Sequence, residues 1–252
     1  METASTQLKP TEQQRKQDRE KSDMKQTLSL SSSVTKKIQT SLDEGYHTVT
    51  QDGDLICAYK NTNIIKKITL GNKVTAFIKT RDWSPISIHS SHINGDILVG
   101  MIKDEEAKVT RYNKIGEEIQ NIQTDNTELG LYEYPHYITE NINGDICTSD
   151  LGNYAVGVVN KSGQYRFSYS SQEICFYPHD ICTDHLGHII VCDPYNYTID
   201  ILHRDGQFLS RLFIEQQEVK YPRGLCVDDE NNLHVGQSKT NTVTVYKYLH
   251  LL

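Results

Sequence analysis

The sequence predicts an all-β fold: a β-propeller of five to six four-stranded blades that follows a polar N-terminal tail. Spacings of 50, 43 and 44 residues separate four prolines, and each proline opens an apolar stretch. Each repeated unit also contains two glycine turns in the same order, with stretches of strand length between them. Four-stranded antiparallel units of this size are typical of propeller blades. A β-sandwich would not predict a fixed order of proline and glycine landmarks.

The first 33 residues differ from the rest of the chain. The segment Thr11–Gln26 is rich in charged and amide side chains and contains one apolar residue, Met24. Such a segment buries too little apolar surface to offset the entropy lost on ordering. We therefore predict a solvated tail or a short exposed helix over residues 1–33, followed by a propeller over 34–252.

Prolines and turns define the repeat. The four prolines are Pro85, Pro135, Pro178 and Pro222. The turns that follow them contain Gly95, Gly144, Gly187 and Asn232, and an earlier copy contains Gly53. Asn-Gly and Asp-Gly favour tight hairpin turns because their central residues need positive φ. We expect blades near residues 41–80, 81–130, 131–173, 174–217 and 218–252, with residues 35–40 completing the last sheet.

The stretches between the turns have the patterns of strands. Ile189–Cys192 is apolar throughout, as expected of a strand buried on both faces. Tyr165, Phe167 and Tyr169 alternate with polar residues, as expected of a strand buried on one face. A single blade is marginal in water, so we expect neighbouring blades to bury each other's apolar faces.

Charge and composition disfavour several classes of protein. The formal net charge is −7 and the sequence pI is about 5.8, whereas binding to nucleic-acid phosphates favours a basic protein. The six cysteines include no C-x-x-C pair, so a structural zinc site is not predicted. No apolar stretch is long enough for a signal peptide or a membrane span. We expect a cytoplasmic protein with no membrane partner.

Several segments resemble a known family of repeats. Asn141–Asp150, Val158–Tyr169, Ile201–Leu209 and Gly224–Asp228 resemble the NHL-repeat propellers of tripartite-motif-like proteins, and the likeness is closest to the expanded set of bivalve molluscs. The resemblance covers roughly residues 35–252. It implies six blades, whereas the glycine turns mark five copies.

The same resemblance implies a role in binding. Members of that family often carry a RING finger, B-boxes and a coiled coil before the propeller, and these modules need dense sets of Cys and His ligands. The first cysteine here is Cys57, already within the repeats. We therefore expect a non-catalytic module, neither an enzyme nor by itself a ubiquitin ligase. The implied function is that of a protein-partner scaffold or a substrate-recognition part in a ubiquitin pathway.

The loops that enter the innermost strands form the predicted binding face. These loops carry aromatic and basic side chains of the kind enriched at binding hot spots. The candidate residues are His136, Tyr137, His179, Asp180, Tyr221 and Arg223. We expect a protein partner at this face. Single-stranded RNA is the alternative, which the net charge disfavours.

A metal site in the central channel is the second alternative. His136 and His179 follow the prolines of consecutive blades, and Asp150 and Asp193 follow the first turns of the same blades. These side chains are suitable zinc or calcium ligands, and they would support a metal-dependent lyase or hydrolase. An arginine at the equivalent position 223 disfavours a cation. We therefore favour structural histidines and turn-capping aspartates, and expect no cofactor.

Overall fold

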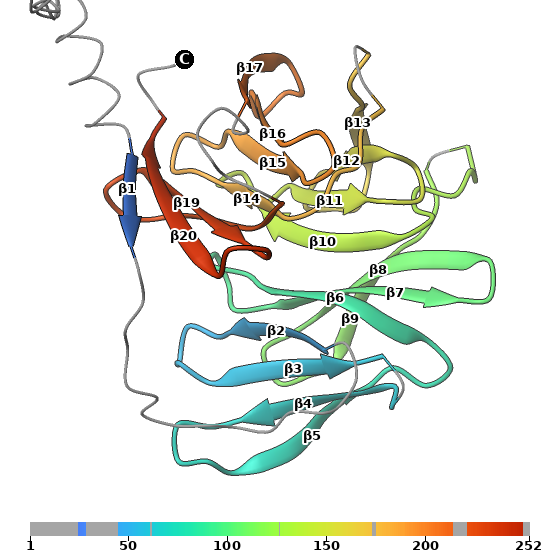
Figure 1. The fold of residues 1–252 in the computed structure, drawn as a ribbon. Coiled ribbons are helices and arrows are strands. Elements are labelled where there is room, and N and C mark those ends of the chain that lie inside the picture. Colours follow the sequence, from blue (N-terminus) through green and yellow to red (C-terminus); the bar gives the residue numbers. More distant parts are fainter. Residues whose placement is uncertain are drawn as a thin grey trace, which may run out of the picture.

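The computed structural model describes residues 25–28, 45–60, 62–125, 127–172, 175–213 and 221–248. These residues form five antiparallel sheets of four strands each, and none of them forms a helix. The sheets are arranged as successive blades of a β-propeller (Figure 1). The predicted all-β propeller is thus confirmed, with five blades. No helix with the length and hydrophobicity needed to cross a membrane occurs among the described residues.

The first four blades are each built from four consecutive strands. Blade 1 contains β2 (Gly45–Val49), β3 (Leu55–Tyr59), β4 (Ile64–Ile68) and β5 (Val74–Lys79). Blade 2 contains β6 (Ser84–Ser90), β7 (Ile97–Lys103), β8 (Glu106–Tyr112) and β9 (Glu118–Ile122). Blade 3 contains β10 (Pro135–Glu140), β11 (Ile146–Asp150), β12 (Ala155–Val159) and β13 (Tyr165–Tyr169). Blade 4 contains β14 (Ile181–Thr183), β15 (Ile189–Asp193), β16 (Thr198–Leu202) and β17 (Phe208–Phe213).

The fifth blade combines both ends of the chain. It contains β18 (Pro222–Val227), β19 (Asn232–Gln237) and β20 (Thr242–Lys247), and its outer strand is β1 (Lys25–Leu28). The pairing runs from Lys25 opposite Tyr246 to Leu28 opposite Val243 (Figure 1). Lys25–Leu28, within the segment predicted as a tail or short helix, thus forms a strand. Ladder hydrogen bonds come from the backbone, so a polar segment can complete an open sheet edge. The predicted closing strand at 35–40 lies outside the described residues.

The first strand of each blade is the innermost. The strands β2, β6, β10, β14 and β18 follow one another, and each packs against the next. Packing of comparable extent between β18 and β2 is not found among the described residues, so these contacts form an arc from blade 1 to blade 5. Two ends of the propeller are used below. The mouth end is where the innermost strands begin, and the base end is where they turn into the second strands.

Apolar side chains fill the space between consecutive blades. Between blades 4 and 5, Ile190 and Ile199 pack with Leu233 and Val235, and all four are fully buried. Similar clusters lie between blades 1 and 2, 2 and 3, and 3 and 4. Each fully buried side chain of this size contributes roughly 1.5–3 kcal/mol. The core is therefore divided among the interfaces between blades.

The turns at the base end repeat one hydrogen-bond pattern. The Asn141 side-chain oxygen accepts the backbone N–H groups of Asn143 and Asp145, both at 2.9 Å. The Asp184 carboxylate likewise accepts the N–H groups of Leu186 and His188. Asn and Asp favour such turns because the short side chain bonds the backbone two to four residues ahead. The repeated residue types seen in the sequence thus have a local structural cause.

Candidate functional site

Irregularities at the mouth end reposition one residue in three of the innermost strands, β6, β10 and β18. The pairing register shifts between Pro85 and Ser87, between Pro135 and Tyr137, and between Pro222 and Gly224. Such bulges redirect side chains and are common beside active sites. The residues at the shifts are Ile86, His136 and Arg223, and His179 directly follows the proline that opens the fourth blade.

Five aromatic rings meet where the innermost strands begin. The His136 ring centroid lies 4.6 Å from that of His179 and 4.5 Å from that of Tyr137. Tyr134 and Tyr46 follow at 5.7 and 6.1 Å from His136. Tyr46 belongs to blade 1 and His136 to blade 3, so this contact reaches past blade 2. We call Tyr46, Tyr134, His136, Tyr137 and His179 the axial cluster.

His179 is the most buried member of the axial cluster. The residue is 5% exposed, and its buried Nδ1 atom has no hydrogen-bond partner among the described residues. Burial, together with the nearby His136 and Arg223, lowers the pKa of His179 to about 3. The imidazole is therefore neutral at pH 7.

Two hollows adjoin the axial cluster. A small cavity of about 140 Å³ is lined by Tyr46 and Tyr137 together with His47, Ser87, Ile88 and Ile138. A larger, open hollow of about 780 Å³ includes Tyr134 in its wall. Its other lining residues are Ile102, Asp104, Glu105, Glu133, Leu151 and Gly152. The second hollow has the volume of a small-molecule site, and its wall carries three acidic residues.

The structure separates the predicted binding-face residues. His136, Tyr137 and His179 lie together in the axial cluster. Asp180 is instead turned into the sheets, where its carboxyl oxygens accept the N–H groups of Ile181 at 2.9 Å and Leu225 at 2.7 Å. Burial raises the pKa of Asp180 to about 7. This carboxyl joins two neighbouring innermost strands.

The other two predicted residues lie at the mouth end of blade 5. Arg223 is exposed and forms no ion pair among the described residues. Tyr221 packs against Tyr197 at a ring distance of 5.3 Å, and the Lys239 ammonium lies 3.4 Å from the Tyr221 ring centroid. Arg223 is linked to the axial cluster through its effect on the His179 pKa, and no ring contact joins Tyr221 to that cluster.

Asp150 and Asp193 serve as backbone caps. The Asp150 carboxylate accepts the N–H groups of Glu133, Tyr134, Gly152 and Asn153 at 2.8–3.1 Å. Asp193 does the same for Tyr177, Tyr195 and Asn196 at 2.9–3.0 Å. Their oxygen lone pairs are directed at the backbone, which is the role favoured for turn aspartates.

The donor set of the channel does not fit a metal ion. Within the described ranges no group of three or more His, Cys, Asp and Glu side chains is placed to bind one. The four candidate ligands His136, His179, Asp150 and Asp193 divide between the axial cluster and the caps. A catalytic zinc site needs three protein ligands that converge on one point. Within the described residues, these four side chains therefore do not form a three-ligand site of this kind.

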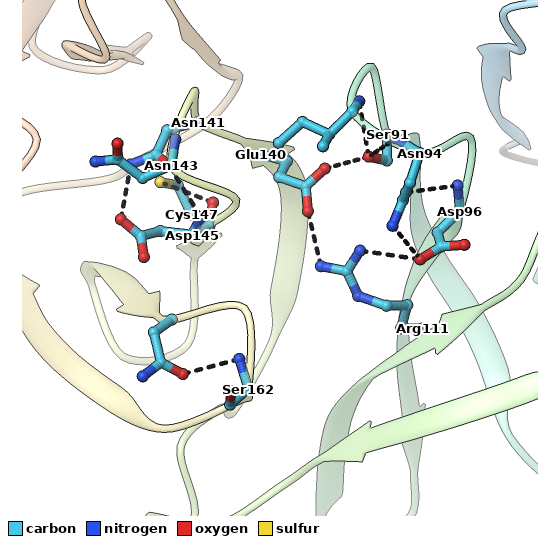
Figure 2. Close-up of polar contacts among 12 residues, drawn as sticks. Ser91, Asn94, Asp96, Arg111, Glu140, Asn141, Asn143, Asp145, Cys147 and Ser162 are labelled. Carbon is cyan, nitrogen blue, oxygen red and sulfur yellow. Dashed lines mark hydrogen bonds and ion pairs between the residues drawn. The ribbon is translucent and has the colours of Figure 1, made fainter.

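A different polar cluster occupies the base end. Arg111 donates to Glu140 at 2.7 Å and to Asp96 at 3.3 Å, and Ser91 donates to the second oxygen of Glu140. Figure 2 shows Glu140 between Ser91 and Arg111, which connects blade 3 to blade 2. The side chains of Arg111 and Glu140 are 7% and 3% exposed. One guanidinium serves carboxylates of two blades, so this cluster joins blades.

Sequence reasoning missed Tyr46 and Tyr134 in the axial cluster. Tyr134 directly precedes Pro135, and tyrosine also precedes Pro178 and Pro222. This repeated Tyr-Pro pair was the available signal for Tyr134. No comparable signal exists for Tyr46, because its contact with His136 crosses the ring.

The sequence matches no protein-family model and no curated protein. The structure is similar to that of virginiamycin B lyase from Staphylococcus aureus, with a TM-score of 0.61 and 20% identity over 80% of this chain and 69% of that chain. A catalytically inactive histidine-to-alanine variant of that lyase, with quinupristin, gives a TM-score of 0.62 and 17% identity over 79% and 68%. A gluconolactonase from Xanthomonas campestris gives 0.60 and 13% over 79% and 70%. These likenesses establish a propeller fold.

The comparisons correct one expectation. We expected a chain that is not an enzyme, but the similar propellers include a lyase and a gluconolactonase. The inference from fold to a non-catalytic role is therefore wrong, because this fold also supports enzymes. Tripartite-motif proteins are not among the similar structures described above.

Proposed function

We propose that this chain is a propeller enzyme of the lyase or hydrolase class that acts on a small polar molecule at the axial cluster. The carrying observation is the buried, unpartnered Nδ1 atom of His179 at the mouth of the propeller. The similar lyase supports this choice, because a histidine-to-alanine variant of it is catalytically inactive.

His179 is the proton acceptor in this proposal. Its lowered pKa keeps the imidazole neutral at pH 7, so it can accept a proton, and makes it a weak base until negative charge develops beside Arg223. In a lyase it would take a proton from a carbon next to a carbonyl while the bond from the neighbouring carbon to its leaving oxygen breaks. In a hydrolase it would take a proton from a water that attacks a lactone carbonyl, and return that proton to the ring oxygen as the acyl–oxygen bond breaks. His136 packs edge-on against His179 and fixes the plane of its ring.

Arg223 supplies the positive charge that would stabilise the deprotonated substrate. Removal of a proton leaves negative charge on the substrate, and a preorganised cation stabilises that charge more in the transition state than in the ground state. Because Arg223 helps to lower the pKa of His179, negative charge beside Arg223 raises that pKa again. The base therefore becomes stronger as the reaction proceeds.

The larger hollow would hold the body of the substrate. It shares Tyr134 with the axial cluster, and Asp104, Glu105 and Glu133 line it. Three carboxylates accept hydrogen bonds from hydroxyl or amino groups and repel an anion. The preferred substrate is therefore a neutral or cationic molecule with several hydrogen-bond donors.

The test is an activity screen of purified protein. The panel contains δ-gluconolactone and other sugar lactones, followed by base consumption at constant pH, and a streptogramin B antibiotic, followed by mass spectrometry. We expect turnover of at least one member. His179→Gln should lower kcat/KM by about 10²–10⁴-fold, the usual contribution of a positioned acid or base.

A matched control comes from the base end of the propeller. His89 also has a buried, unpartnered ring nitrogen and a pKa lowered to about 3, mainly by burial. His89→Gln should retain activity within about threefold, because that ring lies away from the axial cluster. Equal losses in the two variants, or no turnover of any panel member, would contradict the proposal.

The finer resemblance to NHL-repeat propellers of tripartite-motif-like proteins stays a prediction, as do protein and single-stranded RNA partners. A pulldown with a variant carrying His136→Ala, His179→Ala and Arg223→Ala tests a protein partner, because loss of captured proteins would place the interface at the mouth. RNA binding predicts an affinity that weakens steeply between about 50 and 200 mM salt.

A further inference from the structure

Tyrosines occupy a strained backbone position in two blades. In four blades the residue directly before the third strand has positive φ: Asn63 at 48°, Tyr154 at 52°, Tyr197 at 54° and Asn241 at 53°. Asparagine tolerates this left-handed conformation well, whereas a bulky side chain adopts it rarely and at a cost. Blades 3 and 4 thus carry an aromatic side chain where blades 1 and 5 carry a more suitable one.

Tyr154 is part of a group of three rings at the mouth end. The Tyr177 ring lies 5.5 Å from Tyr154 in an edge-to-face arrangement and 5.0 Å from Tyr195 in a tilted one. Tyr154 is 52% exposed and Tyr195 is 60% exposed. We call Tyr154, Tyr177 and Tyr195 the tyrosine triad. The triad uses neither His179 nor Arg223.

Blade 5 has a counterpart in which the third member is a cation. Tyr177 and Tyr221 both directly precede a proline, and Tyr154 and Tyr197 both precede a third strand. The third members are Tyr195 and Lys239, each two residues after the end of a second strand. In blade 5 the Lys239 ammonium lies 3.4 Å from the Tyr221 ring centroid. This chain therefore places an ammonium on the aromatic surface at this position.

The tyrosine triad and its counterpart in blade 5 also differ in the charge of the residue that ends the second strand. The backbone N–H groups of Tyr177 and Tyr195 donate to the Asp193 carboxylate, which is fully buried and forms no ion pair among the described residues. The equivalent residue of blade 5 is the neutral Gln237. Blade 5 thus combines a built-in cation with a neutral side chain, whereas blade 4 combines a carboxylate with a third aromatic ring.

We propose that the tyrosine triad binds an alkylammonium group of a ligand from outside the chain, in the place that Lys239 fills in blade 5. Cations bind over the electron-rich faces of tyrosine rings, and quaternary ammonium groups bind well because they are weakly hydrated. Asp193 adds attraction through its charge, and the acidic chain favours approach of a cation. This site is separate from the proposed reaction.

The test compares a cation with a neutral molecule of the same shape. Choline and 3,3-dimethylbutan-1-ol are titrated into full-length protein, and the tyrosine ring signals are followed by NMR. We expect saturable shifts of the triad signals with choline, and at least tenfold weaker binding of the alcohol. Equal binding of the two would overturn the proposal in favour of a plain apolar patch, and no saturable shift with choline would overturn it outright.

Two variants separate binding from stability. Tyr154→Asn introduces the residue that blades 1 and 5 carry at this position, so the melting temperature should hold or rise while choline binding weakens at least threefold. Tyr177→Phe keeps the ring face and should bind choline as the parent does. Unchanged binding in Tyr154→Asn contradicts the proposal.

A third variant tests the comparison between the tyrosine triad and the Lys239 group of blade 5. Lys239→Ala removes the ammonium from the Tyr221 ring, so a second, weaker choline site should appear in blade 5, seen as new shifts of the Tyr221 signals. If these signals do not respond at choline concentrations that saturate the triad, Lys239 does not mark a cation position and the comparison fails.

Discussion

The two ends of the propeller use charged and polar side chains in opposite ways. At the base end, Arg111 lies between Glu140 and Asp96, and Arg166 lies between Asp145 and Asp205. At the mouth end, Arg223 forms no ion pair among the described residues, and the histidines of the axial cluster pack against tyrosines.

The difference separates side chains that hold blades together from side chains that can bind a ligand. A buried charge that has its partner within the chain holds two blades in register, and it has little left to offer a ligand. A cation or ring nitrogen without such a partner is costly to the fold and available to a substrate. His89 at the base end also has a buried ring nitrogen without a partner among the described residues, so our proposal of function at the mouth end rests in addition on the exposed Arg223 and on the open hollow beside Tyr134.

The largest expected effect on stability is at the base end. Arg111→Met leaves Glu140 buried without its cation, and breaking a buried pair in this way costs about 3–5 kcal/mol. Urea denaturation should show this loss. The matched change at the mouth end, Arg223→Met, should alter stability by less than about 0.5 kcal/mol, since Arg223 is exposed. Similar losses in the two variants would remove the contrast between the ends.

The next effect is a dependence on pH. The folded-state pKa of His179 is about 3, below the ordinary value of 6.5, so the unfolded chain binds more protons between these values. Stability therefore falls as the pH drops below about 6.5, with a slope of at most about 1.4 kcal/mol per pH unit for this group. His179→Gln should flatten the curve of unfolding free energy against pH. A curve unchanged from the parent would show that folding leaves the pKa of His179 near its ordinary value.

A smaller effect is expected where a single hydrogen bond is lost at the base end. The fully buried Tyr248 donates to Asp184 at 2.7 Å, and the same carboxylate oxygen contacts His188 Nδ1 at 2.8 Å. Tyr248→Phe should lower the unfolding free energy by about 1 kcal/mol, because His188 still serves the carboxylate. A loss beyond about 3 kcal/mol in calorimetry would mean that Asp184 depends on Tyr248.

The smallest expected effect is a gain at the mouth end. Tyr154→Asn relieves a left-handed tyrosine and should raise the unfolding free energy by about 1 kcal/mol or less. Tyr195→Ala, which removes an exposed ring of the same triad, should be neutral within about 0.5 kcal/mol. A clear loss of stability in Tyr154→Asn would show that this tyrosine supports the fold.

Much of the architecture is readable from local patterns. Prolines, glycine turns and apolar stretches mark where strands begin and end, because φ preferences and hydrophobic periodicity act within a few residues. The equivalence of His136 with His179, and of Asp150 with Asp193, also follows from the repeat. Repetition thus indicates which residues share a position, although it does not indicate their neighbours.

By itself the sequence determined the all-β repeat, the order of the blades and the residue types at the mouth. Only the tertiary structure decided that Lys25–Leu28 completes the fifth blade, that Tyr46 reaches His136 across the ring, and that Glu140 pairs with Arg111. These contacts join residues 29 to about 220 positions apart, and they depend on how the blades pack rather than on local preference.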